Sequence, residues 1–242
     1  MNEDAQPSTY RPMMTPERAQ RLREWHEQAL QGFRRDAPIT VTEHNRTFVV
    51  PPDVYAPHPL GLAVIVLDEV REGDRVLDMG TGSGVNGIVA ASGSRTVLAV
   101  DVNPAAVACA RDNAERNGVA DRVEVRESDL FQNTPGRFDL IIFDPPFRWF
   151  RPRDMFERGT ADQNYRTLTT FFDQASDHLE PGGRILLSFG TTGDIDYLHH
   201  LITTRGFIAS ELRKFEGEKD GFAVTYFNYR LIIPPISNAA QP

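Results

Sequence analysis

Four aspartates stand at or near the ends of short apolar stretches of the sequence: Asp78, Asp101, Asp129 and Asp144. A glycine-rich run, "DMGTGSGVNG", begins at the first of them. Because the carboxyl ends of parallel strands meet at one edge of a sheet, we expect these carboxylates to surround one site. Carboxylates accept hydrogen bonds from hydroxyl, amine and amide groups. The residue types therefore predict a nucleotide-like ligand bound beside an acid that can hold an N–H group.

The glycine run is compatible with more than one function. Its Gly82, Gly84 and Gly87 satisfy the pattern G-x-G-x-x-G, and Asp101 ends the next apolar stretch, where a dinucleotide fold keeps its ribose-binding acid. A nicotinamide-dependent dehydrogenase is therefore one hypothesis. A glycine loop that only makes a tight turn is another.

A third acid favours adenine recognition. Asp129 ends the stretch "VEVRESD", next to where an adenine would lie if Asp101 held the ribose. Its carboxylate can accept from an exocyclic amine, and the amide of Leu130 can donate to a ring nitrogen. An aspartate that only caps a turn is the alternative interpretation.

The stretch "FDLIIFDPPF" ends an apolar strand on a carboxylate, two prolines and an aromatic ring. Pro145 and Pro146 fix the backbone, so that nearby carbonyls point outward instead of joining a helix. Asp144 and the carbonyl of Pro145 can each accept from N–H groups of a target, and Phe147 can stack on a planar group. This strand end is therefore expected to lie at the chemistry.

Four motifs together resemble a known family. "VLDMGTGSG", "VLAVDVNPAAVACARDNAERNG", "ESDLF" and "FDLIIFDPPF" are similar to the successive motifs of class I S-adenosylmethionine-dependent methyltransferases. The last motif resembles the [D/N/S]-P-P-[Y/F/W] motif of members that methylate nitrogen. "VYAPHPLGLAVIVLDEV" also resembles the segment before the glycine loop in release-factor glutamine methyltransferases. The resemblance extends over about Val54 to Ile232.

The resemblance implies a cofactor, S-adenosyl-L-methionine, and a role for each matching residue. Asp78 and the glycine loop would face the amino-acid part of the cofactor, Asp101 its ribose, and Asp129 its adenine. The implied cofactor-binding residues are Asp78, Gly80, Thr81, Gly82, Gly84, Asp101, Val102, Asn103, Asp129 and Leu130. The implied catalytic residues are Asp144, Pro145 and Phe147, and the implied substrate-binding residues are Tyr55, Pro146, Phe147, Arg148 and Trp149.

One position departs from the glutamine-methylating pattern. Those enzymes usually carry Asn-Pro-Pro-Tyr, whose Asn both donates and accepts, whereas an ionised Asp144 only accepts. This difference favours an amine donor and disfavours glutamine. A small-molecule methyltransferase that acts on oxygen or an aliphatic amine is an alternative, and a non-catalytic S-adenosylmethionine-binding module is a hypothesis of another class. Asp129 and Asp144 together disfavour the dehydrogenase.

Arginines and aromatic residues alternate after this motif, in "RWFRPRDMFERG". The loop at 148–158 is interpreted either as a lip that binds phosphate, carboxylate or stacked bases, or as a packed loop whose arginines pair with Asp154 and Glu157. The net charge of −8 argues against a strong general affinity for nucleic acid. A protein side chain, a nucleobase and a small metabolite all stay open as acceptors.

Apolar stretches alternate with helical patterns from residue 75 onward, which predicts an α/β fold. The expected architecture is a doubly wound, mostly parallel, seven-stranded Rossmann-like sheet that ends in an antiparallel hairpin joined by "EKDG". Residues 15–53 are expected to form a helix and a β-hairpin before a methyltransferase domain at 54–233. Within that domain, helices are expected at about 60–71 and at about 163–179. Loose tails are expected at 1–14 and 234–242.

Composition narrows the remaining possibilities. The chain has 242 residues, of which 40% are hydrophobic and 25% charged, which is typical of a globular protein. Cys109 is the single cysteine, so neither an internal disulfide nor a cysteine-rich zinc site is expected, and no metal site is predicted. The acidic N-terminus lacks the features of a secretory signal, which favours the cytoplasm without a membrane association.

Overall fold

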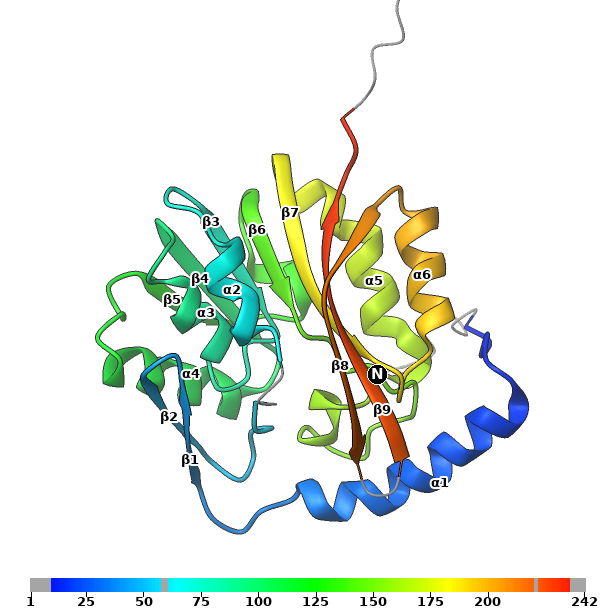
Figure 1. Cartoon of the computed structure of the whole chain (residues 1–242). Helices are drawn as coiled ribbons and strands as arrows, with labels where there is room; N and C mark the ends of the chain where they lie inside the picture. The colour runs from blue at the N-terminus through cyan, green and yellow to red at the C-terminus, as the bar shows by residue number, and fades with distance from the viewer. Residues whose placement is uncertain (1–9, 58–60, 220–221, 236–242) are drawn as a thin grey trace, which may run out of the picture.

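A seven-stranded sheet forms the centre of the computed structural model, which describes residues 10–57, 61–219 and 222–235 (Figure 1). Its strands are β3 (Arg75–Met79), β4 (Thr96–Asp101), β5 (Val123–Glu127), β6 (Phe138–Phe143), β7 (Leu179–Gly190), β8 (Ile208–Lys219) and β9 (Phe222–Ile232). Their order across the sheet is β5-β4-β3-β6-β7-β9-β8. The first five are parallel, and β9 pairs antiparallel with both β7 and β8. The predicted fold class is confirmed.

The strand order reverses at β3, which lies between β4 and β6. Connections from β3 run one way to β4 and β5, and later ones run the other way to β6 and β7. In open α/β sheets the crevice outside the carboxyl ends of the strands at such a reversal is where ligands bind. Asp101 ends β4 and Asp144 follows β6, so the topology brings both to that crevice.

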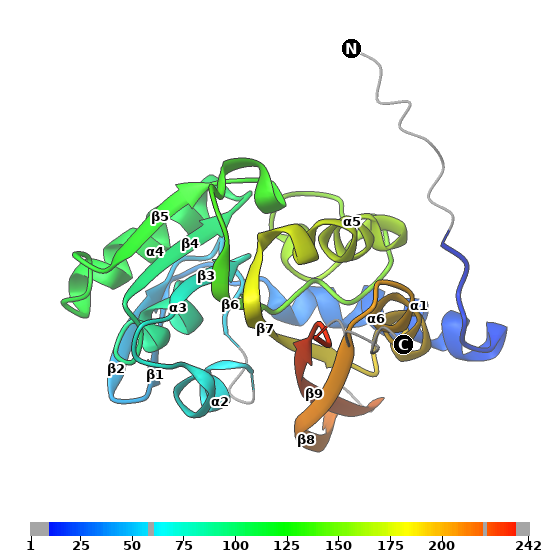
Figure 2. The same ribbon diagram turned by 90° about the horizontal axis from the view of Figure 1, so that it is seen from above.

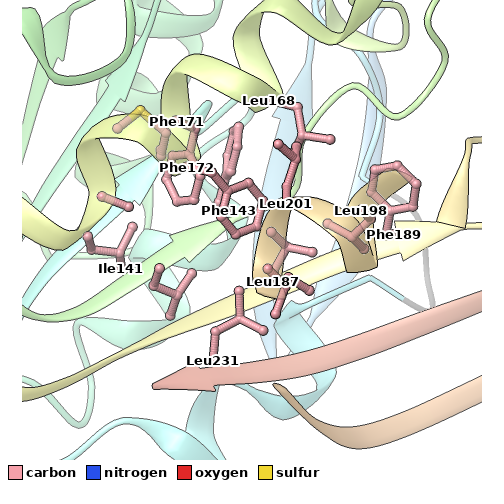
Figure 3. Close-up of a cluster of buried hydrophobic side chains, with 14 of the residues drawn as sticks. Ile141, Phe143, Leu168, Phe171, Phe172, Leu187, Phe189, Leu198, Leu201 and Leu231 are labelled. Carbon is pink, nitrogen blue, oxygen red and sulfur yellow. The ribbon is translucent and has the colours of Figure 1, made fainter. Parts of the chain in front are cut away.

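Helices cover both faces of the sheet (Figure 2). One face carries α2 (Ala63–Glu69), α3 (Val85–Ala90) and α4 (Pro104–Arg116), and the other carries α5 (Arg166–Gln174) and α6 (Ile195–Thr204). Strand β6 alternates between these two cores: Leu140 and Ile142 join the first, while Ile141 and Phe143 join the second (Figure 3). Burial on both faces explains why "LIIF", Leu140 to Phe143, is apolar throughout.

The N-terminal extension consists of α1 (Pro16–Phe33) and a hairpin of β1 (Ile39–Glu43) and β2 (Arg46–Val50). Thr15 caps α1, because its Oγ1 accepts from the amide of Arg18 at 3.3 Å. The hairpin turns without glycine: His44 and Asn45 have φ values of 47° and 60°. These values match the left-handed turn that two-residue hairpin loops favour. The predicted helix and hairpin are confirmed.

The extension contacts both halves of the main sheet. On one side, Trp25 of α1 packs on Phe222 of β9 with ring centroids 5.6 Å apart. On the other, β2 docks on α4, where the amide of Val49 donates to Asn113 Oδ1 at 3.0 Å. Figure 1 shows α1 below the β8–β9 hairpin and β1–β2 beside α4. Tyr10 is also buried, so packing begins before the helix.

Two helical predictions differ from the structure in extent. The helix expected at about 60–71 is observed as α2, with residues 58–60 outside the described part of the chain. The helix expected at about 163–179 is divided into the short 3-10 helix η3 (Gln163–Tyr165), then α5, then η4 (Ala175–His178). The break between η3 and α5 arises because Asn164 and Tyr165 take left-handed φ values of 55° and 52°. Two further short 3-10 helices are η1 (Leu130–Asn133) and η2 (Glu157–Gly159). The tip of the predicted "EKDG" turn lies outside the described residues.

Candidate active site

A cavity of about 770 Å³ opens at the carboxyl edge of the sheet, where the strand order reverses. Its walls come from the glycine loop, the ends of β4, β5 and β6, and the segment between β6 and α5. The predicted site residues that line it are Tyr55, Gly80, Thr81, Gly82, Asp101, Val102, Asn103, Asp129, Leu130, Asp144, Pro145, Pro146, Phe147 and Arg148. Among the described residues, three predicted ones lie away from the lining: Asp78, Gly84 and Trp149.

The glycine loop forms a concave floor. Gly80 and Gly82 have φ values of 67° and 55°, which L side chains rarely adopt. A Cβ placed on Gly82 would meet no atom within 4 Å and would extend into open space. Gly84 has a different role, because a Cβ there would lie 2.9 Å from Ile88 Cδ1 and 3.2 Å from Ala110. Gly82 therefore leaves room for a ligand, and Gly84 leaves room for helix packing.

Asp78 supports this loop from beneath. Its Oδ2 accepts from Thr81 Oγ1 at 2.5 Å and from the amide of Gly87 at 2.9 Å. Burial raises the pKa of the Asp78 carboxyl to about 6, against the effect of these two hydrogen bonds. In the structure Asp78 therefore shapes the loop, and its expected place facing the amino-acid part of the cofactor stays a prediction.

Asp101 joins the loop to the start of α4. Its Oδ2 accepts from the amide of Gly82 at 2.9 Å, and its Oδ1 accepts from the amide of Asn103 at 2.9 Å. Burial raises the pKa of the Asp101 carboxyl, while these backbone bonds oppose the rise. A carboxylate has about four acceptor positions, so Asp101 can still accept from a hydroxyl group of a ligand.

The adenine end of the predicted site is built by a backbone reversal after β5. Leu130 has a left-handed φ of 50°, and Ser128 Oγ donates to the carbonyl of Leu130 at 2.7 Å. Asp129 is exposed at the cavity wall beside this turn. An open glycine floor, an acceptor at Asp101 and an acceptor at Asp129 fit the three parts of S-adenosylmethionine: amino acid, ribose and adenine.

Asp144 leaves the sheet at the end of β6 and faces the same cavity. Because Phe143 pairs with Leu187 in the parallel register, the next residue of β7, Ser188, lies beside Asp144. Burial raises the pKa of the Asp144 carboxyl to about 6, the nearby Asp78 adds to the rise, and a hydrogen bond from Ser188 opposes it. Ser188 therefore orients this carboxylate and stabilises its ionised form.

Aromatic side chains enclose the space around Asp144. The ring of Phe147 packs on Phe189, with centroids 5.5 Å apart, and meets Tyr226 of β9 nearly edge-on at 6.2 Å. Burial raises the pKa of the Tyr55 hydroxyl to about 12, and the adjacent Arg148 opposes the rise. The Arg148 guanidinium is itself buried, over the Phe147 ring at 5.8 Å. The Asp144 end of the cavity is therefore flat-walled and holds both a carboxylate and a cation.

Sequence reasoning missed Ser188 and Tyr226 and misplaced Trp149. Ser188 ends the apolar stretch "RILLS" as the aspartates end theirs, which is a signal that could have identified it. Tyr226 reaches the cavity because it pairs with Gly190, a register that no local pattern reveals. Trp149 is buried beside Tyr10, with ring centroids 6.3 Å apart, so the structure places it in the core and outside the cavity lining.

The arginine-rich loop divides into two parts. Arg151 and Arg158 line the cavity, as one interpretation expects. Arg153 instead pairs with Glu157 at 2.8 Å, as the packed-loop interpretation expects. Among the described residues, no three acidic, histidine or cysteine side chains are arranged to hold a metal ion. No helix within the described part of the chain has the length and apolar character needed to cross a membrane.

Comparison with known proteins identifies the family. The sequence model of the "Methyltransferase small domain" family matches residues 46–201. A Methanocaldococcus jannaschii protein named as an N5-glutamine methyltransferase is 32% identical over 162 residues, which cover 62% of this chain and 79% of the relative. The release factor glutamine methyltransferase of Cereibacter sphaeroides is 34% identical over 161 residues, or 60% of this chain and 57% of that one.

Solved structures support the fold. The tRNA m1G37 methyltransferase of M. jannaschii aligns with a TM-score of 0.59 over 81% of this chain and 58% of its own, at 20% identity. At that identity the likeness concerns the fold alone. The family match covers the glycine loop, Asp101, Asp129 and the end of the strand that leads to Asp144. The chain therefore belongs to the methyltransferase small-domain family and is an S-adenosylmethionine-dependent methyltransferase.

Proposed function

We propose that the enzyme methylates a nitrogen atom on a planar group of its acceptor. The observation that supports this most directly is the position of Asp144, at the end of β6, in a cavity that also contains the glycine loop and Asp101. A carboxylate at this point can hold N–H groups of an acceptor while a methyl donor occupies the loop side. Phe147 gives the acceptor a flat surface, as a planar group requires.

The side chains of the cavity supply orientation and electrostatics. S-adenosylmethionine, when bound, supplies an electrophilic methyl group. The nitrogen of an amide or aryl amine has its lone pair delocalised, so it needs to be held with that pair directed at the methyl carbon. Asp144 and the carbonyl of Pro145 accept from its N–H groups and stabilise positive charge as it develops. Phe147 and Tyr226 exclude water from one side.

Two hydrogen-bond donors in the same cavity as Asp144 refine the class of acceptor. Tyr55 and Arg148 line the same cavity and carry N–H and O–H groups. Together with Asp144 they suit a planar group that presents N–H on one side and oxygen or ring nitrogen on the other. Side-chain amides and nucleobases both have this arrangement, and aliphatic amines do not. Relatives named for glutamine methylation agree with this class. Glutamine, disfavoured by Asp144 alone, becomes compatible once these donors are included.

Labelled methyl transfer to a cell extract, separated into protein, RNA and small molecules, tests the proposal. Asp144→Ala should lower transfer about 100-fold or more, because it removes a group that acts on the transition state. Cofactor affinity, measured by titration calorimetry, should stay within about tenfold. Asp177→Asn, which removes an exposed carboxylate on η4, is the control and should transfer normally. Full turnover by Asp144→Ala, or label in an alkali-labile ester, would rule out the proposal.

A further inference from the structure

A chain of hydrogen bonds connects the Asp144–Phe147 segment to the N-terminal segment of the protein. None of its members was predicted as a site residue, and it lies behind the cavity. We infer that Tyr165 and Asp194 are positioning residues that hold the acceptor-binding segment in place, and that Tyr10 completes this support from the N-terminal side. The inference rests on the proposed role of Asp144 and Phe147 in holding the acceptor.

Tyr165 is the central member. Its hydroxyl donates to the carbonyl of Phe147 at 2.8 Å and accepts from the amide of Asp194 at 2.6 Å. The side chain is fully buried. Because the Phe147 carbonyl ends the motif that begins with Asp144, this bond fixes the exit of the motif. Fixing the backbone there also fixes the ring of Phe147 against Phe189.

The backbone around Tyr165 is strained in a way that depends on its surroundings. Asn164 and Tyr165 are consecutive non-glycine residues in the left-handed region. Such conformations are unfavourable alone and persist where neighbouring contacts determine them. Here Asp162 accepts from the amides of Thr167 and Leu168, each at 2.9 Å, and the amide of Asn164 donates to the carbonyl of Trp149 at 3.0 Å. These bonds hold the kink that directs the Tyr165 hydroxyl at Phe147.

The turn after β7 supports the same carbonyl. A Cβ on Gly193 would overlap the oxygen of Phe147, so only glycine allows this approach. The next residue, Asp194, caps α6 with Oδ1, which accepts from the amide of Tyr197 at 3.2 Å. The turn therefore presents the Asp194 amide to Tyr165 as part of a rigid helix start.

The other oxygen of Asp194 holds the N-terminal segment. Asp194 Oδ2 accepts from the Tyr10 hydroxyl at 2.9 Å and from the Met13 amide at 2.7 Å. Tyr10 also meets the Tyr165 ring edge-on, with centroids 4.8 Å apart. Arg18 of α1 donates to the carbonyl of Thr191 in the same turn at 2.9 Å. The N-terminal extension thus reaches the acceptor-binding segment through Asp194 and Tyr165.

Tyr165→Phe tests the inference because it removes one hydroxyl and keeps the ring. Tyr229→Phe is the matched control. Tyr229, on β9, is also buried, and its hydroxyl forms a hydrogen bond of 3.3 Å with Nε2 of His199 on α6. Hydrogen exchange at the amides of residues 147–150 should become faster in Tyr165→Phe and stay at the wild-type rate in Tyr229→Phe. Unchanged exchange in Tyr165→Phe would overturn the inference. This measurement needs no acceptor, so its result is separable from failure of the proposed function.

Kinetics with the acceptor fraction that takes label give the second readout. Tyr165→Phe should lower kcat about tenfold, because the acceptor-binding segment loses one hydrogen bond that holds it in place. The Kd for S-adenosylmethionine should stay within about twofold. Tyr10→Phe should have a smaller effect, and the double variant should lose less than the product of the two single effects, because both act through Asp194. If Tyr165→Phe lost cofactor affinity in parallel with rate, the substitution would have damaged the whole fold and the inference would fail. If the effects of the two single variants multiplied in the double variant, Tyr10 would not act through Asp194.

Discussion

Asp144 is largely buried, which favours its neutral form, yet its proposed role requires the charged form. Its carboxyl is held in a cavity where burial raises its pKa to about 6, and its proposed role requires the ionised form. Ser188 lowers this pKa and so favours ionisation, as the proposed role demands. The pH dependence of the reaction therefore includes the ionisation of Asp144, and a comparison with Asp144→Asn separates it from the ionisation of Asp78 and Asp162.

Methyl transfer is predicted to fall as the pH falls through about 6. Below that value Asp144 is increasingly protonated, loses an acceptor position and presents a donor to the N–H groups of the acceptor. The measurement is kcat/KM between about pH 5 and pH 8 in wild type and in Asp144→Asn. The variant should be slow at every pH and should lack the inflection. A wild-type rate that stays level down to about pH 5 would contradict the assignment.

Gly82 gives a second prediction at the residue scale. Gly82→Ala should weaken S-adenosylmethionine binding about tenfold or more, because the new methyl group would project into the cavity. Gly118→Ala is a closely matched control: its φ of 65° is similar, and a Cβ there also meets nothing within 4 Å, but it lies outside the cavity lining. Both variants should lose about 1 kcal/mol of stability.

Titration calorimetry and thermal unfolding separate these two effects. If both alanine variants bound the cofactor equally well, the glycine loop would not face it. If Gly82→Ala lost affinity without the stability loss seen in Gly118→Ala, its backbone would have left the left-handed region.

Residues at strand ends could be predicted from the sequence, and residues that depend on strand pairing could not. Asp101 and Asp144 each follow an uninterrupted apolar stretch, so their position in the chain determines their edge of the sheet. Tyr226 lies within an antiparallel strand, and only its pairing with Gly190 brings it to the cavity. The predicted position of Trp149 was wrong for a similar reason. Its ring packs near Tyr10, which is distant in the sequence, and near Tyr165, whose left-handed backbone no local pattern predicts.

At the scale of elements, one buried ion pair joins β7 to the start of β3. Arg184 and Asp74 are both buried, and Nη2 of the arginine lies 2.6 Å from Oδ2 of the aspartate. Arg184 also donates to the carbonyl of Asp139, near the start of β6, at 3.1 Å. These contacts lie at the amino ends of the strands, opposite the cavity, and fix the strands that carry Asp144 and Ser188.

Arg184→Met is predicted to lower the free energy of unfolding by about 3–5 kcal/mol, because it leaves the Asp74 carboxylate buried without its cation. Arg205→Met, which removes an exposed ion pair with Asp173, should cost no more than about 1 kcal/mol. Urea unfolding provides both values. The folded fraction of Arg184→Met should keep its cofactor affinity. Equal losses in the two variants would mean that the buried pair contributes no more than a surface pair.

The kink before α5 marks the limit of prediction for elements. Residues 163–179 have a continuous helical pattern, yet Asn164 and Tyr165 break it at the start. Local sequence contains no glycine or proline to signal this break. It is maintained by tertiary contacts, above all those of Tyr165 with Phe147 and Asp194, which residue patterns along the chain do not report.

For the whole molecule, three largely buried carboxyl groups in and beside the cavity lower the free energy of unfolding at neutral pH. Asp78, Asp144 and Asp162 each have a carboxyl pKa raised to about 6, mainly by burial. The folded state keeps these protons to higher pH than the unfolded chain does. Their stabilising contribution is therefore present below about pH 4 and is lost as the pH rises through about 6.

Asp144→Asn is predicted to raise Tm relative to wild type, more at about pH 8 than at about pH 5. The amide carries no charge at either pH, so the variant avoids a cost of at most about 3 kcal/mol that wild type incurs when Asp144 ionises. Thermal unfolding at the two pH values measures this difference, and the same variant should transfer methyl groups poorly. If Asp144→Asn were less stable than wild type at about pH 8, the ionised Asp144 carboxylate would not destabilise the fold.

The contact between Trp25 and Phe222 has a consequence for how the protein is made. The helix that contains Trp25 is synthesised before every strand of the sheet, and its partner β9 is the last strand of the sheet to be synthesised. Every strand must therefore emerge from the ribosome before this contact forms, and contacts between remote residues form slowly. Strand β9 also carries Tyr226 of the cavity wall, so a chain that stopped before β9 would lack part of that wall.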